Sequence, residues 1–298
     1  MDIKKNEDLA EARLLGKNIA FPQSYDATIL VAVPRQINRI QYHLDSSALP
    51  FVGYDVWHGY ELSFLTENGL PVNGVLKMVY SSNTPNIVES KSFKLYLNSL
   101  NNSRFGRNSD EAKELIKNLI EKDLSLIVEG LVSCSIFENK REIVPFDFDD
   151  YKVLEEVIDV DNEEFIDFKE SPSHLMFSLS ESRSIKISSN ILRSNCKITE
   201  QPDWGTVFIT IEAEHGIDLM GLLKYLVSFR NENHFHEEIC EMIYKRLLDA
   251  FKPSELSVTC LYTRRGGIDI CPTRASAKEL LPSNLINNIC LTEKLLRQ

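Results

Sequence analysis

Hydrophobic and polar positions along the chain follow two related patterns. In the first, residues 75–81 are strand-like, residues 88–99 and 109–121 favour helices, and residues 123–128 favour a strand. The second helix has an apolar face at i, i+3 and i+4 spacing, made by Ala112, Leu115, Ile116, Leu119 and Ile120. We therefore expect strands and helices to be mixed in this half of the chain.

The second pattern repeats the first about 130 residues later. Residues 206–214 alternate and predict a strand, and residues 217–229 predict a buried helix with Asp218 as its N-cap. A helix is expected over 236–251 and a strand over 255–262. In that strand one face is formed by Leu256, Val258, Cys260 and Tyr262.

Two pairs of short strings align the halves: 95–100 with 224–229, and 123–125 with 255–257. Each half then consists of a strand pair, two helices and a further strand pair, which is an α+β fold with an antiparallel sheet and helices on one face. We expect domains at 1–145 and 146–298, with the acidic stretch 146–170 as their connection. Chance similarity between two unrelated α+β halves remains the alternative.

Composition narrows the function classes. A chain of 298 residues suits two domains, and its net charge of −11 argues against a nucleic-acid backbone as a direct partner. No stretch has the roughly 18–20 apolar residues that span a bilayer, and the N-terminal residues 1–8 are charged, unlike a signal peptide. We expect a cytoplasmic protein that does not bind membranes.

Motifs for metals and nucleotides are missing from the sequence. The six cysteines form no C-x-x-C pair, and no H-E-x-x-H, G-x-G-x-x-G or P-loop occurs. We expect free thiols and no metal, with a Cys/His meeting in space as the remaining route to zinc. Any one cysteine taken alone is more often a buried apolar residue than a reactive one.

Cys196 stands out because its polar neighbours suggest a partly exposed loop just before a strand. A thiol needs some exposure and a base or a positive charge nearby to react as thiolate. Asp203, between Pro202 and Trp204, could act as general acid or base, with its pKa raised beside the indole. The alternative is a turn in which Asp203 binds backbone amides.

Three other strings could bind a ligand. Phe235, His236 and Glu237 open a predicted helix, where Glu237 could cap the helix or accept N–H bonds from a base stacked on Phe235. The run 89–94 and the Arg264-Arg265-Gly266 turn suit anions, although solvated ends of elements explain both equally well.

Taken together, these strings resemble the NADPH-dependent 7-cyano-7-deazaguanine reductases of queuosine biosynthesis in their long, two-module form. The resemblance is carried by Glu89–Tyr96, by Cys196 with Gln-Pro-Asp-Trp-Gly, by 235–237 and by Arg264–Asp269. Val33–Arg35 and the segment from Asp55 to Glu61 also look familial, and the similarity is weakest over 135–190. It implies two tandem tunnelling-fold (T-fold) modules, which explains the repeat as a duplication, and a homodimer.

The resemblance also implies roles for individual residues. Cys196 would add to the nitrile carbon of the deazapurine substrate to give a thioimide, with Asp203 as proton donor and His236 assisting. Two NADPH molecules in succession would reduce it to the amine, 7-aminomethyl-7-deazaguanine. Glu89, Phe235, His236 and Glu237 would hold the base. NADPH would be bound by Glu89, Ser90, Lys91, Ser92, Lys94, Arg264, Arg265 and Gly266.

One departure concerns Cys271, where the family usually has asparagine, so a cofactor-binding role at that position is in doubt. Two other functions stay open. A purine or pterin hydrolase of cyclohydrolase type would keep the fold but require zinc. A base-binding module without catalysis would have no need for the thiol.

Overall fold

The computed structural model describes residues 22–138, 143–179 and 181–298 and is built around one nine-stranded sheet. The charged residues 1–8, considered above as a possible leader, lie outside this range. Eight strands lie side by side in the order β12 (Asn233–His234), β9 (Ser184–Cys196), β10 (Pro202–Glu212), β13 (Glu255–Tyr262), β14 (Ile268–Ala275), β2 (Val52–Leu65), β3 (Pro71–Ser81) and β5 (Val132–Phe137). The ninth, β7 (Lys152–Val153), pairs with β9.

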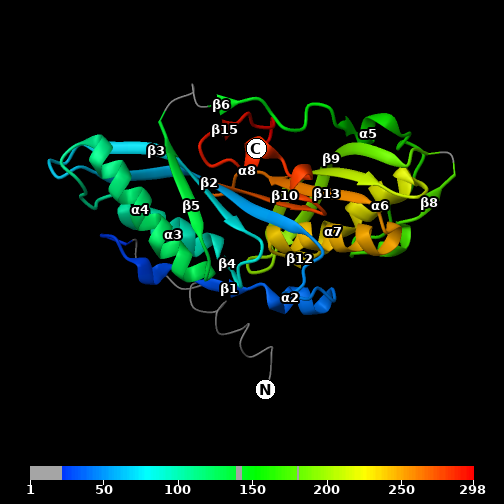
Figure 1. Ribbon diagram of the computed structural model, residues 1–298, viewed down its shortest axis with the longest axis horizontal. Helices are drawn as coiled ribbons and strands as arrows, with labels where there is room; N and C mark the ends of the chain where they lie inside the picture. Colours follow the sequence, from blue (N-terminus) through cyan, green and yellow to red (C-terminus); the bar gives the residue numbers. More distant parts are fainter. Residues whose placement is uncertain (1–21, 139–142, 180) are drawn as a thin grey trace, which may run out of the picture.

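The long helices all cover one face of this sheet (Figure 1). Helices α3 (Ser90–Leu100) and α4 (Ser109–Val128) pack on the strands of the first half, and α6 (Leu219–Ser228) and α7 (His236–Phe251) pack on those of the second. Among the described residues, no helix is long and apolar enough to cross a membrane.

Shorter elements complete the fold. The remaining helices are α2 (Gln36–Gln41), α5 (Leu154–Val157) and α8 (Ser283–Ile286), with 3-10 turns η1 (Ala27–Ile29), η3 (Pro172–His174), η4 (Phe229–Asn231) and η5 (Lys278–Leu280). Three small strand pairs are β1 (Ala32–Pro34) with β4 (Asn86–Val88), β8 (Phe177–Ser178) with β11 (Gly216–Ile217), and β6 (Ile143–Val144) with β15 (Leu291–Thr292).

The predicted internal repeat is visible in α3 and α6, which have the same local contacts. Tyr96 and Tyr225 are both fully buried. Three residues later, the hydroxyls of Ser99 and Ser228 each donate to the carbonyl of that tyrosine at 2.6 Å. Asp218 caps α6 by accepting from the Met220 N–H, as predicted. The α+β class is confirmed, and the string match 95–100 with 224–229 joins equivalent positions. The sheet is not antiparallel throughout, because β12 and β7 both pair with β9 in parallel.

The strand predicted over 123–128 is wrong, because these residues are the last turns of α4. The apolar i, i+4 series from Ala112 continues through Leu124 to Val128, all fully buried, so the helical face has no break at residue 121. The helix ends where Glu129 adopts a left-handed conformation, with φ of 55°. The strand follows as β5, so 123–125 is not equivalent to 255–257.

The two halves are joined by antiparallel pairing of β14 with β2, which places Trp57 opposite Ile270 and His58 opposite Asp269. Pairing of these strands hides two edges that would otherwise be exposed. The second half thus continues the sheet of the first half within one chain. Any site at this junction can draw residues from both halves.

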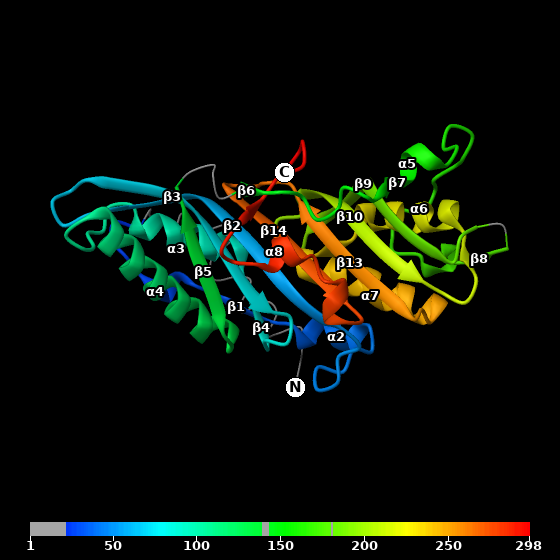
Figure 2. The same ribbon diagram turned by 45° about the horizontal axis from the view of Figure 1, so that its top comes forward.

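The acidic connection packs onto the sheet instead of forming a free linker. Its first residues, 146–151, lie on the face opposite the long helices together with α8 and the C-terminal residues (Figures 1 and 2). After β7, which pairs with β9, the chain continues to the helix side of the sheet, where Glu163 pairs with Lys224 of α6 at 2.6 Å. Phe148 stacks on Phe208 of β10 with ring centroids 4.2 Å apart, and Leu154 is fully buried. These apolar residues, which lack a regular period, explain why the sequence pattern gave no sign of this packing.

Candidate active site at the junction of the two halves

A cavity of about 300 Å³ lies between the N-terminal end of α3 and the ends of β9, β13 and β14. From the first half it is lined by Glu89, Ser90, Lys91 and Lys94, and from the second by Cys196, Ile198, Thr199, Gln201, His236, Thr263, Arg265, Gly266, Ile268 and Ile270. A smaller recess adjoins it and is lined by Trp57, Val88, Ser90, Cys196, Asp203, His234, Phe235, His236, Glu237, Arg265 and Ile270. Residues from both halves of the chain, far apart in the sequence, thus meet at Cys196.

Cys196 is the last residue of β9 and lines both spaces, although only 8% of it is exposed. The expectation of a partly exposed loop residue is wrong in this respect. Its N–H donates to the Gln201 carbonyl at 2.8 Å, and β12 pairs with the strand end from the other side. Backbone pairing therefore covers the cysteine and leaves its side chain toward the cavity.

Asp203 faces the recess from the start of β10 and is 6% exposed. Its Oδ1 lies 2.9 Å from Nη1 of Arg265, and its Oδ2 lies 3.6 Å from Nε2 of His236. Trp204, the next residue on the strand, points to the opposite face, over Arg193 and Arg230. The partners of this carboxylate are therefore a guanidinium and an imidazole, and not the indole considered from the sequence.

Glu237 and Glu238, in the first turn of α7, make different contacts. Glu238 accepts from the Phe235 N–H at 3.1 Å and so caps the helix. Glu237, 2% exposed, instead accepts from the indole N–H of Trp57 at 3.1 Å and lines the recess. The helix is therefore capped by Glu238 and not by Glu237, the alternative considered from the sequence. Glu237 lines the recess together with Phe235.

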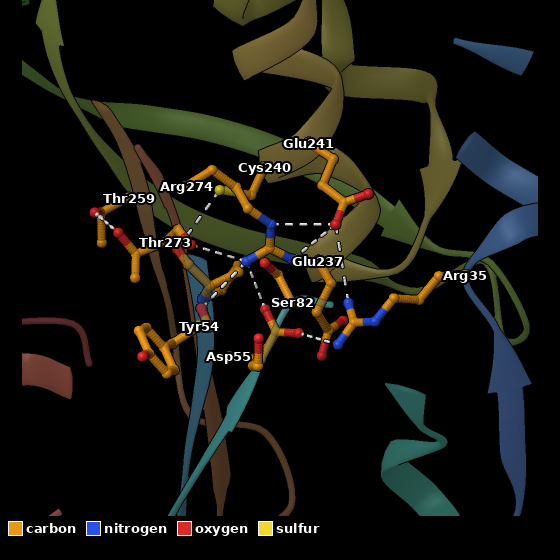
Figure 3. A network of polar contacts seen from close by, with 12 residues as sticks. Arg35, Tyr54, Asp55, Ser82, Glu237, Cys240, Glu241, Thr259, Thr273 and Arg274 are labelled. Carbon is orange, nitrogen blue, oxygen red and sulfur yellow. Dashed lines mark hydrogen bonds and ion pairs between the residues drawn. The ribbon is translucent and has the colours of Figure 1, made fainter. Parts of the chain in front are cut away.

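Buried charges lie directly behind Glu237 (Figure 3). Asp55 is paired with Arg35 at 2.5 Å and with Arg274 at 2.8 Å, and Arg274 also pairs with Glu241 at 3.0 Å. Burial raises the pKa of Glu237 to about 8, and the negative charge of Asp55 adds to the rise, while Arg35 and Arg274 oppose it.

Glu89 is the N-cap of α3, where its carboxylate accepts from the N–H groups of Lys91 and Ser92. The anion site expected at this helix end is thus already occupied by the chain's own carboxylate. Ser90, Lys91 and Lys94 face the cavity. Ser92 does not lie with them, because its fully buried hydroxyl donates to the Glu89 carbonyl and accepts from the Val31 N–H.

The adjacent arginines differ in position. Arg265 lines both the cavity and the recess. Arg264 instead lies over the ring of Tyr60, with its guanidinium carbon 3.3 Å from the ring centroid. Gly266, with φ of 60°, forms part of the cavity wall, and its carbonyl accepts from Lys94 Nζ at 2.8 Å. The structure thus brings Arg265 and Gly266 to the site and leaves Arg264 outside the cavity lining.

One group of metal-ligand type occurs in the described part of the chain: His58, Asp269 and Cys271, all buried. Asp269 already accepts from Tyr60 at 2.5 Å, contacts His58 at 2.6 Å and pairs with Lys294 at 3.3 Å. The Lys294 ammonium thus provides a positive charge beside the Asp269 carboxylate. Asp269 and Cys271 also alternate with Ile268 and Ile270, which line the cavity, so the group faces away from Cys196. Cys271 therefore also faces away from the cavity in which the cofactor is expected.

The fold and the site together define a class: an α+β protein whose cavity, at the junction of its two halves, presents a thiol beside a carboxylate, an arrangement suited to covalent chemistry on a small ligand. Two family models match, "Nitrile reductase, 7-cyano-7-deazaguanine-reductase N-term" over residues 21–136 and "QueF-like protein" over residues 202–280. The chain belongs to the NADPH-dependent 7-cyano-7-deazaguanine reductase family.

Relatives named NADPH-dependent 7-cyano-7-deazaguanine reductase support this membership. The one from Rickettsia canadensis is 40% identical over 92% of this chain and 96% of its own length. The one from Colwellia psychrerythraea is 41% identical over 90% of this chain and 93% of its own. The crystal structure of the archaeosine synthase QueF-Like in the apo form matches 33% of this chain and 98% of that chain, at 16% identity and a TM-score of 0.30, and carries no argument about the fold.

Sequence reasoning missed the role of the residues behind the recess. Trp57, Asp55 and Arg35 lie within two strings that look familial, yet nothing local in these strings shows that they face Glu237. Only the register in which β2 pairs with β14 shows that these residues lie behind the recess, and this register cannot be derived from either string alone. The aromatic residues of the segment 55–65 are equally typical of core packing, which gives no reason to assign Trp57 a role at a site.

Proposed function

We propose that the protein reduces the nitrile of 7-cyano-7-deazaguanine to the primary amine 7-aminomethyl-7-deazaguanine, in the pathway to tRNA queuosine. The observation that carries this proposal is the meeting of Cys196, Asp203 and Glu237 around one recess, with Arg265 lining both that recess and the larger cavity. Family membership supplies the reaction class, and the site supplies the residues. The proposal includes a T-fold for each half.

In the proposed chemistry, the Cys196 sulfur forms a bond to the nitrile carbon while the nitrile nitrogen gains a proton from Asp203. The proton that leaves the thiol returns to Asp203, so a thiol and a nitrile become a thioimide without net gain or loss. His236, 3.6 Å from Asp203, assists this transfer. Later protonation of the substrate nitrogen passes along the same two side chains.

NADPH would supply two hydrides in succession, the first releasing the Cys196 thiolate and an imine, and the second giving the amine. In total, one nitrile, two NADPH and two protons are converted into one amine and two NADP⁺. The cationic side chains of Lys91, Lys94 and Arg265 line the cavity and suit the phosphate groups of a dinucleotide. Gly266 would allow close approach of the cofactor.

The base would lie in the recess, with Phe235 against its ring. A carboxylate accepts two parallel N–H bonds, so Glu237 is suited to the N–H edge of a guanine-type base. Glu89 would contact the base or the cofactor from the other half of the chain. Its carboxylate holds two backbone N–H groups and keeps further lone pairs for a ligand.

We also propose a homodimer in the cytoplasm. The order of strands ends at β5, which pairs on one side with β3. Within the described part of the chain no strand pairs with its other edge, and such an edge is a suitable place for a second copy to add its own strand. Light scattering on the purified chain tests the dimer, and a mass of one chain would contradict it.

Activity is tested by following NADPH absorbance in the presence of 7-cyano-7-deazaguanine and quantifying the amine formed. Consumption of two NADPH per amine supports the proposal, and absence of oxidation contradicts it. The cyclohydrolase alternative predicts hydrolysis that depends on stoichiometric zinc. A base-binding module predicts binding of the base with no NADPH consumed.

A further inference from the structure

We propose that Trp57 is a positioning residue that makes the site specific for guanine-type bases by fixing the orientation of the Glu237 carboxylate. The inference rests on the proposed function, in which Glu237 accepts the N–H edge of the base. It assigns a task to a side chain of the first half that acts on a recognition residue of the second. Trp57 acts through Glu237 and needs no contact with the reacting nitrile.

The position of the indole is determined by its surroundings. Trp57 is 1% exposed in the middle of β2, between Met78 of β3 and Ile270 of β14 in the strand register. Its ring meets the edge of Phe93 at a centroid distance of 5.5 Å and an angle of 86°. A donor held on both sides by paired strands cannot follow a moving carboxylate, so the carboxylate has to orient toward the donor.

The direction of the hydrogen bond between Trp57 and Glu237 is fixed by the chemistry of the indole. An indole N–H donates and never accepts, so the Glu237 oxygen at 3.1 Å is an acceptor. One N–H occupies one of about four lone-pair sites of a carboxylate and thereby sets its plane. The remaining sites are acceptors, and Glu237 lines the recess with them.

The charges behind Glu237 support the same helical turn (Figure 3). Glu241, one turn further along α7, accepts from Arg39 at 2.7 and 2.8 Å and pairs with Arg274. Arg274 in turn pairs with Asp55, two residues before Trp57 on β2. The backbone of Glu237 is thus anchored to the same strand that carries the indole, and the Trp57 N–H determines the remaining freedom of the side chain.

A fixed acceptor pair discriminates between purine edges. The Watson–Crick edge of a guanine-type base presents two adjacent N–H donors, which match two carboxylate oxygens. An adenine-type base presents a ring nitrogen lone pair at the central position, which would meet a carboxylate oxygen without a proton between them. Without the Trp57 N–H the carboxylate can rotate away from this repulsion, so discrimination should decrease together with affinity.

The test uses the full-length chain with Trp57→Phe, which keeps an aromatic ring and removes the N–H. Calorimetric titration should show about 10-fold weaker binding of 7-cyano-7-deazaguanine. In steady-state kinetics, the KM for NADPH should stay within about twofold of the wild-type value. The preference over 7-cyano-7-deazaadenine should decrease as well. Phe93→Leu is the matched control, because it disturbs the packing of the same indole but leaves the N–H in place; its affinity should change less than about threefold.

Wild-type affinity and selectivity in Trp57→Phe would overturn the inference, and so would an equal loss in Phe93→Leu. A wild-type protein that binds no base overturns the proposed function and this inference together. If Trp57→Phe does not fold, Trp204→Phe leaves Trp57 as the only indole, since the chain has 2 tryptophans. Its fluorescence should then change as the base is titrated in, and unchanged emission during normal turnover would contradict the assigned contact.

Discussion

The guanidinium of Arg265 lies 2.9 Å from the carboxylate of Asp203, and the same arginine lines both the large cavity and the adjoining recess. In the proposed reaction, this side chain would contact both the cofactor and the proton donor. Arg264, its neighbour in sequence, lies over Tyr60 instead. Two adjacent arginines therefore provide a matched comparison.

Arg265→Ala should raise the KM for NADPH about 10-fold or more, because a charge-assisted contact to a phosphate or amide oxygen is lost. Arg264→Ala should change it less than about threefold. Steady-state kinetics with varied NADPH measure both. Equal effects, or a larger effect of Arg264→Ala, would show that the cavity is not where the cofactor binds.

The two glutamates at the start of α7 should respond in opposite ways to the same substitution. Glu237→Gln should abolish detectable binding of the base, because an amide offers one acceptor and presents a donor to the second N–H. Glu238→Gln should retain binding but lower the free energy of unfolding by about 1 kcal/mol, since Glu238 caps the helix and contacts His234 at 3.2 Å. Calorimetric titration and urea unfolding of both variants separate these roles.

Affinity for the base should depend on pH through Glu237. Burial and the nearby charge of Asp55 raise the pKa of this carboxyl to about 8, against the opposing charges of Arg35 and Arg274. The ionised form, which accepts two N–H bonds, is therefore present above this pH and is lost as the pH falls through it. The Kd should increase up to about 10-fold for each pH unit below 8. Glu238→Gln, which retains Glu237 and its binding of the base, should show the same slope as the wild type, and a flat wild-type profile would contradict the raised pKa.

The buried charges behind the site should contribute strongly to stability. Arg274 is fully buried between Asp55 and Glu241, so Arg274→Met leaves two buried carboxylates with one positive partner fewer. The free energy of unfolding should fall by about 3–5 kcal/mol. Lys186→Ala removes a pair with Asp150 whose side chains are 52% and 61% exposed, and should cost less than about 1 kcal/mol. Similar losses in the two variants would contradict a structural role for the buried network.

Local patterns in the sequence were sufficient for the two long helices of the second half and for two of its long strands, β10 and β13, but not for β9 and β14. The expected helix over 236–251 and strand over 255–262 agree with α7 and β13. The failure over 123–128 has a physical reason: a short apolar run of this kind fits a strand as well as the end of a helix. Only the continuing i, i+4 series into Val128 decides for the helix.

The candidate site was predictable only in part, for reasons of long-range structure. The residues that meet at Cys196 were found as separate strings, but their meeting depends on the pairing of β14 with β2, which no local pattern contains. Glu237 and Glu238 are chemically identical neighbours, and only the start of the helix determines which of them caps it. The burial of Cys196 likewise follows from strand pairing, whereas its polar neighbours suggested exposure.

The central claim is that Cys196 forms a covalent bond to the nitrile carbon of a substrate that is then reduced twice. The most direct measurement is mass spectrometry of the intact protein mixed with 7-cyano-7-deazaguanine without NADPH, followed by turnover with NADPH. We expect an adduct with the full mass of the nitrile in the wild type, no adduct in Cys196→Ala, and two NADPH consumed per amine by the wild type alone. An adduct or turnover that survives Cys196→Ala would contradict it.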